Sequence, residues 1–224
     1  MDNILLEKSI LSENGRTFYW TAQTNKEVTL VFLPGLTANH ILFEKQILYF
    51  YDKYNILVWD CPCHGKSRPY KNFNYLNISR ELNTILEAEG SEKVVIIGQS
   101  LGGMIGQYYI DAYPSRVLGF VSIDSSPFGD YYKKSDFFWL SQLEWMCRLF
   151  PENKEIKLPC TAILILGDGD CVGKVATYNK KWANKTGYPL NIIKNAAHNS
   201  NDDRPEEVNQ IIENYVQSIE AVRI

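Results

Sequence analysis

The stretch "VVIIGQSLGGMIGQYY" at residues 94–109 joins two different kinds of sequence. Its first residues are apolar and β-branched, as in a strand that is buried on both faces. After Ser100 the pattern changes to that of a helix, and Gly98 and Gly102 stand two positions on either side of the serine. Glycines at these positions let neighbouring backbone come close. The stretch therefore predicts a buried strand that turns sharply into a helix, with a hydroxyl group at the turn.

Short apolar runs of the same kind recur along the chain. They are continuous rather than alternating, which is expected for strands covered by helices on both faces. These runs occupy residues 28–33, 56–59, 94–97, 117–123, 161–166 and 190–193. Before them, "SILSENGRTFYWTA" at residues 9–22 predicts a hairpin around Asn14 and Gly15.

Helical patterns lie between the apolar runs, at residues 75–89, 101–113 and 205–222. Gly90 is expected to end the first of these helices, and Asp203 with Glu206 resembles a capping box before the last. A hairpin followed by alternating strands and helices predicts an α/β fold whose sheet is mostly parallel after an antiparallel start.

One segment is longer than a connection between a strand and a helix requires. Residues 127–158 are rich in Phe and Trp, and we expect them to form a short insertion that packs over the edge of the sheet. The length of 224 residues is that of one domain. We therefore expect a single domain over 1–224, with its core at 1–126 and 159–224.

Composition limits the class of partner and the compartment. A net charge of -3 disfavours nucleic acid, which requires a basic face. The first residues lack the features of a signal peptide, and no stretch approaches the ~20 apolar residues of a membrane span. The five cysteines have no disulfide-framework spacing, so we expect reduced thiols in a cytoplasmic protein. The oligomeric state is left open by the sequence.

The hydroxyl of Ser100 is in a position suited to nucleophilic attack. In the sequence G-x-S-x-G it follows a buried strand, and the helix after it directs its N-terminal N–H groups toward the turn. The alternatives are a glycine-rich helix start that serves packing alone, or a dinucleotide-binding loop. The second is disfavoured because G-x-G-x-x-G is absent. We predict that Ser100 is a nucleophile that requires a base to take its proton.

His198 is the candidate base among three histidines. It follows the last predicted strand and precedes the final helix, in the chain order serine, acid, histidine. His40 precedes the serine, and His64 lies in a turn-like loop.

Three carboxylates are candidates for the acid that orients this imidazole. Asp170, in "GDGD" after a buried strand, is the preferred one. Asp168 is also suited to shaping the turn, because Asp-Gly is a common turn pair. Asp124, which ends an earlier strand, is the third candidate.

A developing oxyanion requires two hydrogen-bond donors. The turn at Pro34 and Gly35 ends a strand, so the backbone N–H of Leu36 is expected to face that of Leu101, the residue after the nucleophile. The alternative is a plain turn between a strand and a loop.

Together these residues resemble the α/β-hydrolase superfamily over nearly the whole chain. The resemblance lies in "LPGL" at 33–36, "DCPCHGKSRP" at 60–69, "GQSLGG" at 98–103, "GDGD" at 167–170 and "AAHN" at 196–199. Cys63 departs from the glycine usual at its position in the second motif, and the histidine of that motif is normally structural in the family. The resemblance implies an eight-stranded sheet with helices on both faces, a triad of Ser100, Asp170 and His198, and a cap insertion.

The expected activity is hydrolysis of an ester or related acyl bond in a small, apolar substrate, as in carboxylesterases and lipases. Trp139, Phe138 and Leu143 of the insertion are expected to line the substrate site. We expect no cofactor. We also expect no metal, because "CPCH" at 61–64 has no second half of a metal site. Two alternatives remain: a small-molecule receptor of the same fold, and a cofactor-free haloperoxidase or perhydrolase. Fold alone does not separate these functions.

Overall fold

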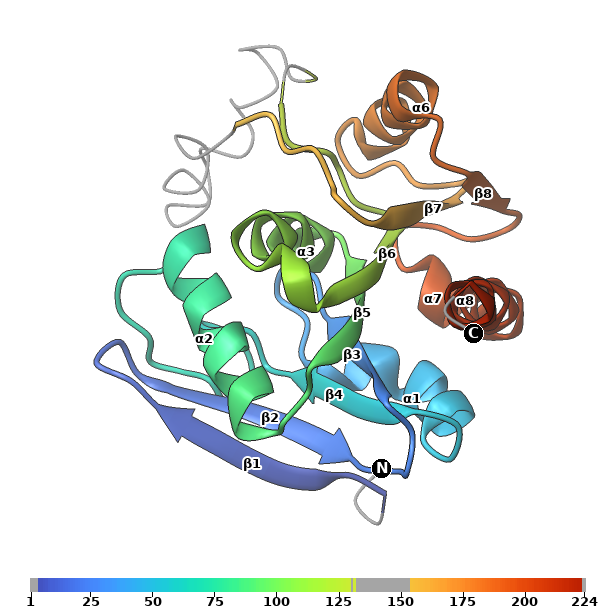
Figure 1. Ribbon diagram of the computed structural model, residues 1–224. Coiled ribbons are helices and arrows are strands. Elements are labelled where there is room, and N and C mark those ends of the chain that lie inside the picture. Colours follow the sequence, from blue (N-terminus) through green and yellow to red (C-terminus); the bar gives the residue numbers. More distant parts are fainter. Residues whose placement is uncertain (1–3, 130, 132–153, 223–224) are drawn as a thin grey trace.

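The computed structural model describes residues 4–129, 131 and 154–222, which form one sheet (Figure 1). Its strands lie in the order β1-β2-β4-β3-β5-β6-β7-β8. β2 runs antiparallel to both β1 and β4, and all other neighbouring strands are parallel. The strands are β1 (Leu6–Leu11), β2 (Arg16–Ala22), β3 (Val28–Leu33), β4 (Asn55–Trp59), β5 (Lys93–Gln99), β6 (Val117–Ile123), β7 (Thr161–Gly167) and β8 (Leu190–Ile193). The predicted eight-stranded, mostly parallel α/β fold is confirmed.

Helices follow most of the parallel strands. In the described part of the chain they are α1 (Glu44–Phe50), α2 (Tyr75–Ala88), α3 (Leu101–Ala112), α6 (Val175–Thr186), α7 (Ser200–Asp203) and α8 (Pro205–Ala221), with short 3₁₀ helices η1 (His40–Phe43) and η2 (Pro114–Arg116). The sequence predicted α2, α3 and α8, but not the others. Most of the expected insertion at 127–158 lies outside the described residues, and the domain boundaries stay a prediction.

The two faces of the sheet carry separate apolar cores. Alternate residues of β3 point in opposite directions, and all four of its central side chains are fully buried. Val31 and Leu33 belong to the cluster that includes side chains of α2, α3 and α6. Leu30 and Phe32 belong to the cluster that includes α1 and α8. Figure 1 shows these two sets of helices on opposite sides of the sheet. Burial on both sides explains why the strands are continuously apolar.

The ends of two helices test two sequence expectations. Gly90 follows the last turn of α2 with a φ of 63°, the left-handed conformation expected of a glycine that ends a helix. The prediction of a capping box before α8 was wrong. The residue before this helix is Arg204, which makes no side-chain cap, and Pro205 occupies the first turn. Asp203 belongs to α7, where its carboxylate instead accepts a hydrogen bond from the backbone N–H of Ala197 at 2.7 Å.

Candidate active site

The turn between β5 and α3 holds Ser100 in an uncommon backbone conformation. Its φ is 51° and its ψ is -119°, a region that costs free energy for residues other than glycine. A Cβ on Gly98 would lie 2.5 Å from the carbonyl oxygen of Gly102, and a Cβ on Gly102 would collide with the carbonyl oxygen of Leu33. Glycine is therefore required on both sides of the serine, and the tight turn leaves the Ser100 side chain only partly buried.

The imidazole of His198 reaches this serine from the loop after β8. Its Nε2 atom lies 2.9 Å from Oγ of Ser100, and its Nδ1 atom lies 3.0 Å from Oδ2 of Asp170. Both distances are in the range of hydrogen bonds. If Nδ1 donates its proton to the carboxylate, Nε2 is left as an acceptor for the serine hydroxyl. The three side chains predicted from the sequence are thus brought together in a hydrogen-bonded series.

The carboxylate of Asp170 is buried behind the imidazole. Its side chain is 0% exposed, whereas that of His198 is 21% exposed. Its second oxygen accepts from the backbone N–H of Val172 at 2.9 Å. The other two candidate acids have different positions. Asp168 is exposed, and Asp124 accepts backbone hydrogen bonds with both of its oxygens. Among the described contacts of these three carboxylates, only that of Asp170 joins the imidazole of His198.

The loop that carries the imidazole is attached to the turn at the nucleophile. Nε2 of Gln99 donates to the backbone carbonyl of His198 at 2.7 Å and to the side-chain oxygen of Asn199 at 3.0 Å. Gln99 is 2% exposed and directly precedes Ser100. Sequence reasoning missed it. The available signal was a glutamine at the first variable position of G-x-S-x-G. Its long amide side chain can reach a loop that lies beside the turn.

The predicted oxyanion donors come from two segments that lie close together. A Cβ on Gly35 would lie 2.9 Å from the Cβ of Ser100, so the turn after β3 contacts the turn at the nucleophile directly. Leu101 is the first residue of α3, and Leu36 is partly buried beside the apolar cluster of that face. Within the described residues, no protein acceptor is found for the backbone N–H of either leucine. Their role as donors stays a prediction.

The other two histidines are occupied elsewhere. His64 is buried, and its Nδ1 atom lies 2.9 Å from the carbonyl oxygen of Pro62. Burial lowers the pKa of this imidazole. His40 stacks on Trp20 with ring centroids 3.6 Å apart, and its Nδ1 atom lies 2.7 Å from Oδ1 of Asp60. Neither histidine makes a described contact with Ser100.

Cys63, in the motif that contains His64, has a strained backbone conformation. Cys63 has a φ of 67°, the left-handed conformation that glycine adopts most readily. The next residue but one, Gly65, packs its Cα so close to Asp60 that a Cβ there would collide with the carboxylate. The substitution of cysteine for glycine is therefore accommodated by backbone strain.

The predicted substrate-lining residues Trp139, Phe138 and Leu143 lie outside the described residues, and their role stays a prediction. The described start of the expected insertion is aromatic. Phe128 is 2% exposed and packs edge-on against Tyr75, with ring centroids 5.1 Å apart, and Tyr75 stacks on Tyr108 at 5.4 Å.

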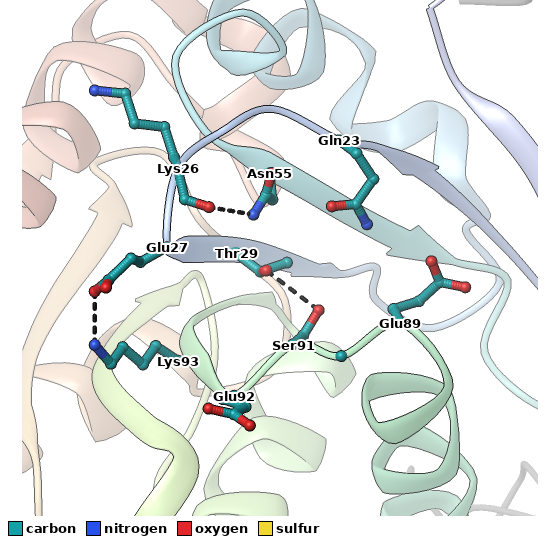
Figure 2. A pocket seen from close by; sticks show the side chains of 10 residues that line it. Gln23, Lys26, Glu27, Thr29, Asn55, Glu89, Ser91, Glu92 and Lys93 are labelled. Carbon is teal, nitrogen blue, oxygen red and sulfur yellow. Dashed lines mark hydrogen bonds and ion pairs between the residues drawn. The ribbon is translucent and has the colours of Figure 1, made fainter.

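A hollow lies at the end of the strands opposite to Ser100. It is a polar pocket of about 260 Å³ at the amino ends of β3 and β5 (Figure 2), lined by Gln23, Lys26, Glu27, Thr29, Asn55, Glu89, Gly90, Ser91, Glu92 and Lys93. Several of its polar groups bind one another: Lys93 pairs with Glu27 at 2.6 Å, and the hydroxyls of Thr29 and Ser91 lie 3.2 Å apart. In open parallel sheets ligands bind at the carboxyl ends of strands, where Ser100 lies. We therefore do not assign the active site to this pocket.

None of the helices in the described part of the chain combines the length and the apolar character that crossing a bilayer requires.

Comparison with known proteins identifies the family. The model of the alpha/beta hydrolase fold family matches residues 28–160, more than half of the chain, and the chain therefore belongs to that family. The resemblance inferred from the sequence motifs is confirmed.

Individual relatives are more distant. A pimeloyl-(acyl-carrier protein) methyl ester esterase of Wigglesworthia glossinidia brevipalpis is 28% identical over 112 residues, which are 50% of this chain and 42% of the relative. The 3-oxoadipate enol-lactonase 2 of Acinetobacter baylyi is 28% identical over 88 residues, 39% of this chain and 33% of the relative. The chain thus spans less than half the length of these curated relatives. A thermophilic esterase from Thermogutta terrifontis has the same fold, with a TM-score of 0.76, 15% identity, and coverage of 96% of this chain and 99% of that one.

Proposed function

We propose that this chain is a serine hydrolase that cleaves an ester or related acyl bond of a small substrate through an acyl-Ser100 intermediate. The observation that carries the proposal is the hydrogen-bonded series from Oγ of Ser100 through the imidazole of His198 to the carboxylate of Asp170. An alcohol becomes an effective nucleophile when an oriented base takes its proton during attack. The named relatives include an esterase and a lactonase, whose substrates are carboxylic esters.

In the first half of the reaction, Oγ of Ser100 attacks the carbonyl carbon while its proton moves to Nε2 of His198. The carbonyl oxygen gains the electron pair and becomes an oxyanion, for which the N–H groups of Leu36 and Leu101 are the proposed donors. Asp170 stabilises the imidazolium by accepting from Nδ1. When the oxyanion collapses, His198 gives its proton to the leaving oxygen, the alcohol departs, and the acyl group stays on Ser100.

In the second half, water attacks the acyl carbon and loses its proton to His198. Collapse of this second intermediate breaks the bond to Oγ of Ser100, which takes the proton back, and the carboxylic acid is released. The only material consumed is one ester and one water, so this chemistry requires no cofactor. Trp139, Phe138 and Leu143 are proposed to contact the acyl group.

A fluorophosphonate probe tests the proposed nucleophile. The wild-type chain is expected to be labelled at Ser100, and Ser100→Ala to remain unlabelled. p-Nitrophenyl esters of graded chain length then test the reaction, with a burst of p-nitrophenol as the sign of acyl-enzyme accumulation. Absence of labelling would favour a receptor. Labelling with negligible hydrolysis of every ester would favour haloperoxidase or perhydrolase chemistry.

A further inference from the structure

A buried carboxylate beside the proposed triad is not used by the mechanism above. Asp124 directly follows β6, and its side chain is 0% exposed. Its backbone has a φ of 45°, in the left-handed region, and its N–H donates to the carbonyl of Ile165 at 2.9 Å. The residue is thus held at the carboxyl edge of the sheet, between β5, which ends just before Ser100, and β7, which leads to Asp170.

The two oxygens of Asp124 bind the two loops that supply the acid and the base. Oδ1 accepts from the backbone N–H of Gly167 at 2.8 Å, at the start of the loop with Asp170. Oδ2 accepts from the backbone N–H of Ser200 at 2.9 Å, two residues after His198. One carboxylate therefore fixes the separation of these loops, and an ionised carboxylate can accept both bonds at once.

We propose that Asp124 is a positioning residue, whose ionised carboxylate holds the loops of Asp170 and His198 at the separation that their mutual hydrogen bond requires. This inference rests on the proposed function, because it concerns the efficiency of the same site. Asp124 does not touch the reacting atoms in this scheme. It acts through the geometry of the base and the acid, and displacements of about 1 Å in such groups cost roughly 10²-fold in rate.

The charge on Asp124 depends on pH near neutrality. The pKa of this carboxyl is raised from 3.8 to about 6: burial raises it most, the hydrogen bonds from Ser200 and Gly167 partly oppose the rise, and the negative charge of Asp170 adds to it. Three elements are packed around it. The end of β5 contributes no charged group, and the loop after β7 carries Asp168 and Asp170. The segment after β8 carries the titratable or charged groups Lys194, His198, Asp202, Asp203 and Arg204. A protonated carboxyl oxygen becomes a donor and a much weaker acceptor, so protonation weakens the hold on one of the two loops.

This protonation does not by itself unfold the chain. Because the pKa of Asp124 is higher in the folded state than its ordinary value of 3.8, the folded state takes up the proton more readily than the unfolded state. The contribution of this group to the free energy of unfolding therefore rises as the pH falls from about 6 toward 3.8. Activity that is lost through Asp124 in that window is expected while the fold persists.

The experiment compares the wild-type chain with Asp124→Asn and, as a matched control, with the exposed Asp168→Asn. The value of kcat/KM for a p-nitrophenyl ester is measured from about pH 4 to about pH 8, with circular dichroism at each pH to confirm folding. For the wild type we expect log kcat/KM to fall with a slope greater than one over part of the range below about pH 6, because protonation of Asp124 adds to the loss caused by protonation of the base. For Asp124→Asn we expect a limiting slope of one and a plateau roughly 10- to 100-fold lower. Asp168→Asn should behave as the wild type.

A wild-type slope that nowhere exceeds one between about pH 4 and about pH 6 overturns the inference, even if Asp124→Asn does not fold. So does an Asp124→Asn plateau equal to that of the wild type. Either result leaves the proposed function standing, provided that the wild type hydrolyses the ester and is labelled at Ser100. A wild-type chain that is neither labelled nor active overturns the proposed function first, and this inference with it.

Discussion

The side-chain amide of Gln99 donates a hydrogen bond to the backbone carbonyl of His198, with 2.7 Å between the two atoms. Gln99 directly precedes Ser100, so the residue next to the proposed nucleophile also holds the loop of the proposed base. Gln99 and His198 are 99 positions apart in the sequence. This contact therefore ties the loop of His198 directly to the turn that carries Ser100.

Replacement of Gln99 by leucine tests this contact. Gln99→Leu removes both donors while keeping a similar volume, and we expect kcat/KM to fall roughly 10- to 100-fold because the imidazole is less well placed. Gln107→Leu is the matched control: Gln107 is also buried and its amide also donates to two carbonyls, those of Gly103 and Ser126, but it does not contact the base loop. If Gln107→Leu loses more kcat/KM than Gln99→Leu at a similar melting temperature, the positional argument is wrong.

The choice of acid can be tested by removing one charge at a time. Asp170→Asn is expected to lower kcat by up to roughly 10⁴, because asparagine does not stabilise the required tautomer and imidazolium. Asp168→Asn should change kcat only slightly, since this side chain is exposed and makes no described contact with His198. Both variants should melt near the wild-type temperature. A larger loss in Asp168→Asn than in Asp170→Asn would reverse the assignment.

The requirement for glycine two residues after the proposed nucleophile can be tested by measuring stability. In Gly102→Ala the new Cβ would collide with the backbone carbonyl of Leu33, which cannot move aside within the sheet. We expect the free energy of unfolding to fall by about 3 kcal/mol or more. In Gly106→Ala the new Cβ would lie 2.9 Å from side-chain atoms of Ile96 and Phe120, which can shift. Urea denaturation should therefore show a clearly smaller loss for Gly106→Ala, and equal losses would refute the steric argument.

The buried carboxylate of Asp60 predicts how stability depends on pH. Burial raises the pKa of this group, but hydrogen bonds from the side chain of His40 and from the backbone N–H groups of Lys66 and His40 prevail, so that the pKa is lowered below 3.8. A lowered pKa stabilises the fold above the ordinary value, and this stabilisation is lost as the pH falls through the folded-state pKa.

We expect Asp60→Asn to lower the free energy of unfolding by roughly 1–3 kcal/mol near neutral pH, because buried N–H groups lose a charged acceptor. The difference from the wild type should shrink as the pH falls below 3.8. Urea denaturation at a series of pH values measures it. A difference that is constant or that grows in acid would show that the charge of Asp60 does not stabilise the fold.

The sheet could be predicted almost completely because each strand carries its own signal. β3 and β6 are continuously apolar and β-branched, and their predicted bounds agree with the observed ones. The missed helices lack such a signal. α6 buries only Tyr178, Asn179 and Trp182, which is too few for a recognisable apolar stripe. Its stability comes from packing on the sheet, a tertiary effect that local sequence does not contain.

For the site, the sequence predicted which residues would meet but not what holds them. Ser100, Asp170 and His198 each follow a strand, and parallel strands bring their carboxyl ends to one edge of a sheet. That argument needs only chain order. Gln99 and Asp124 act through contacts to backbone atoms of loops 43 or more positions away. Backbone acceptors and donors have no sequence signature, so the partners of these two side chains could not be predicted, and Asp124 was considered only as an alternative acid.

The chain departs from the sheet after β6 and comes back before β7 at adjoining points, since a Cβ on Gly129 would be 3.6 Å from the Cα of Glu155. A segment whose two ends lie side by side can be replaced by a segment of another length. The replacement does not change the direction of either strand. Selection, or a protein engineer, can then replace this segment without changing the strands that lead to the proposed triad. Grafting the corresponding segments of other family members between these two points would test whether the segment sets substrate preference.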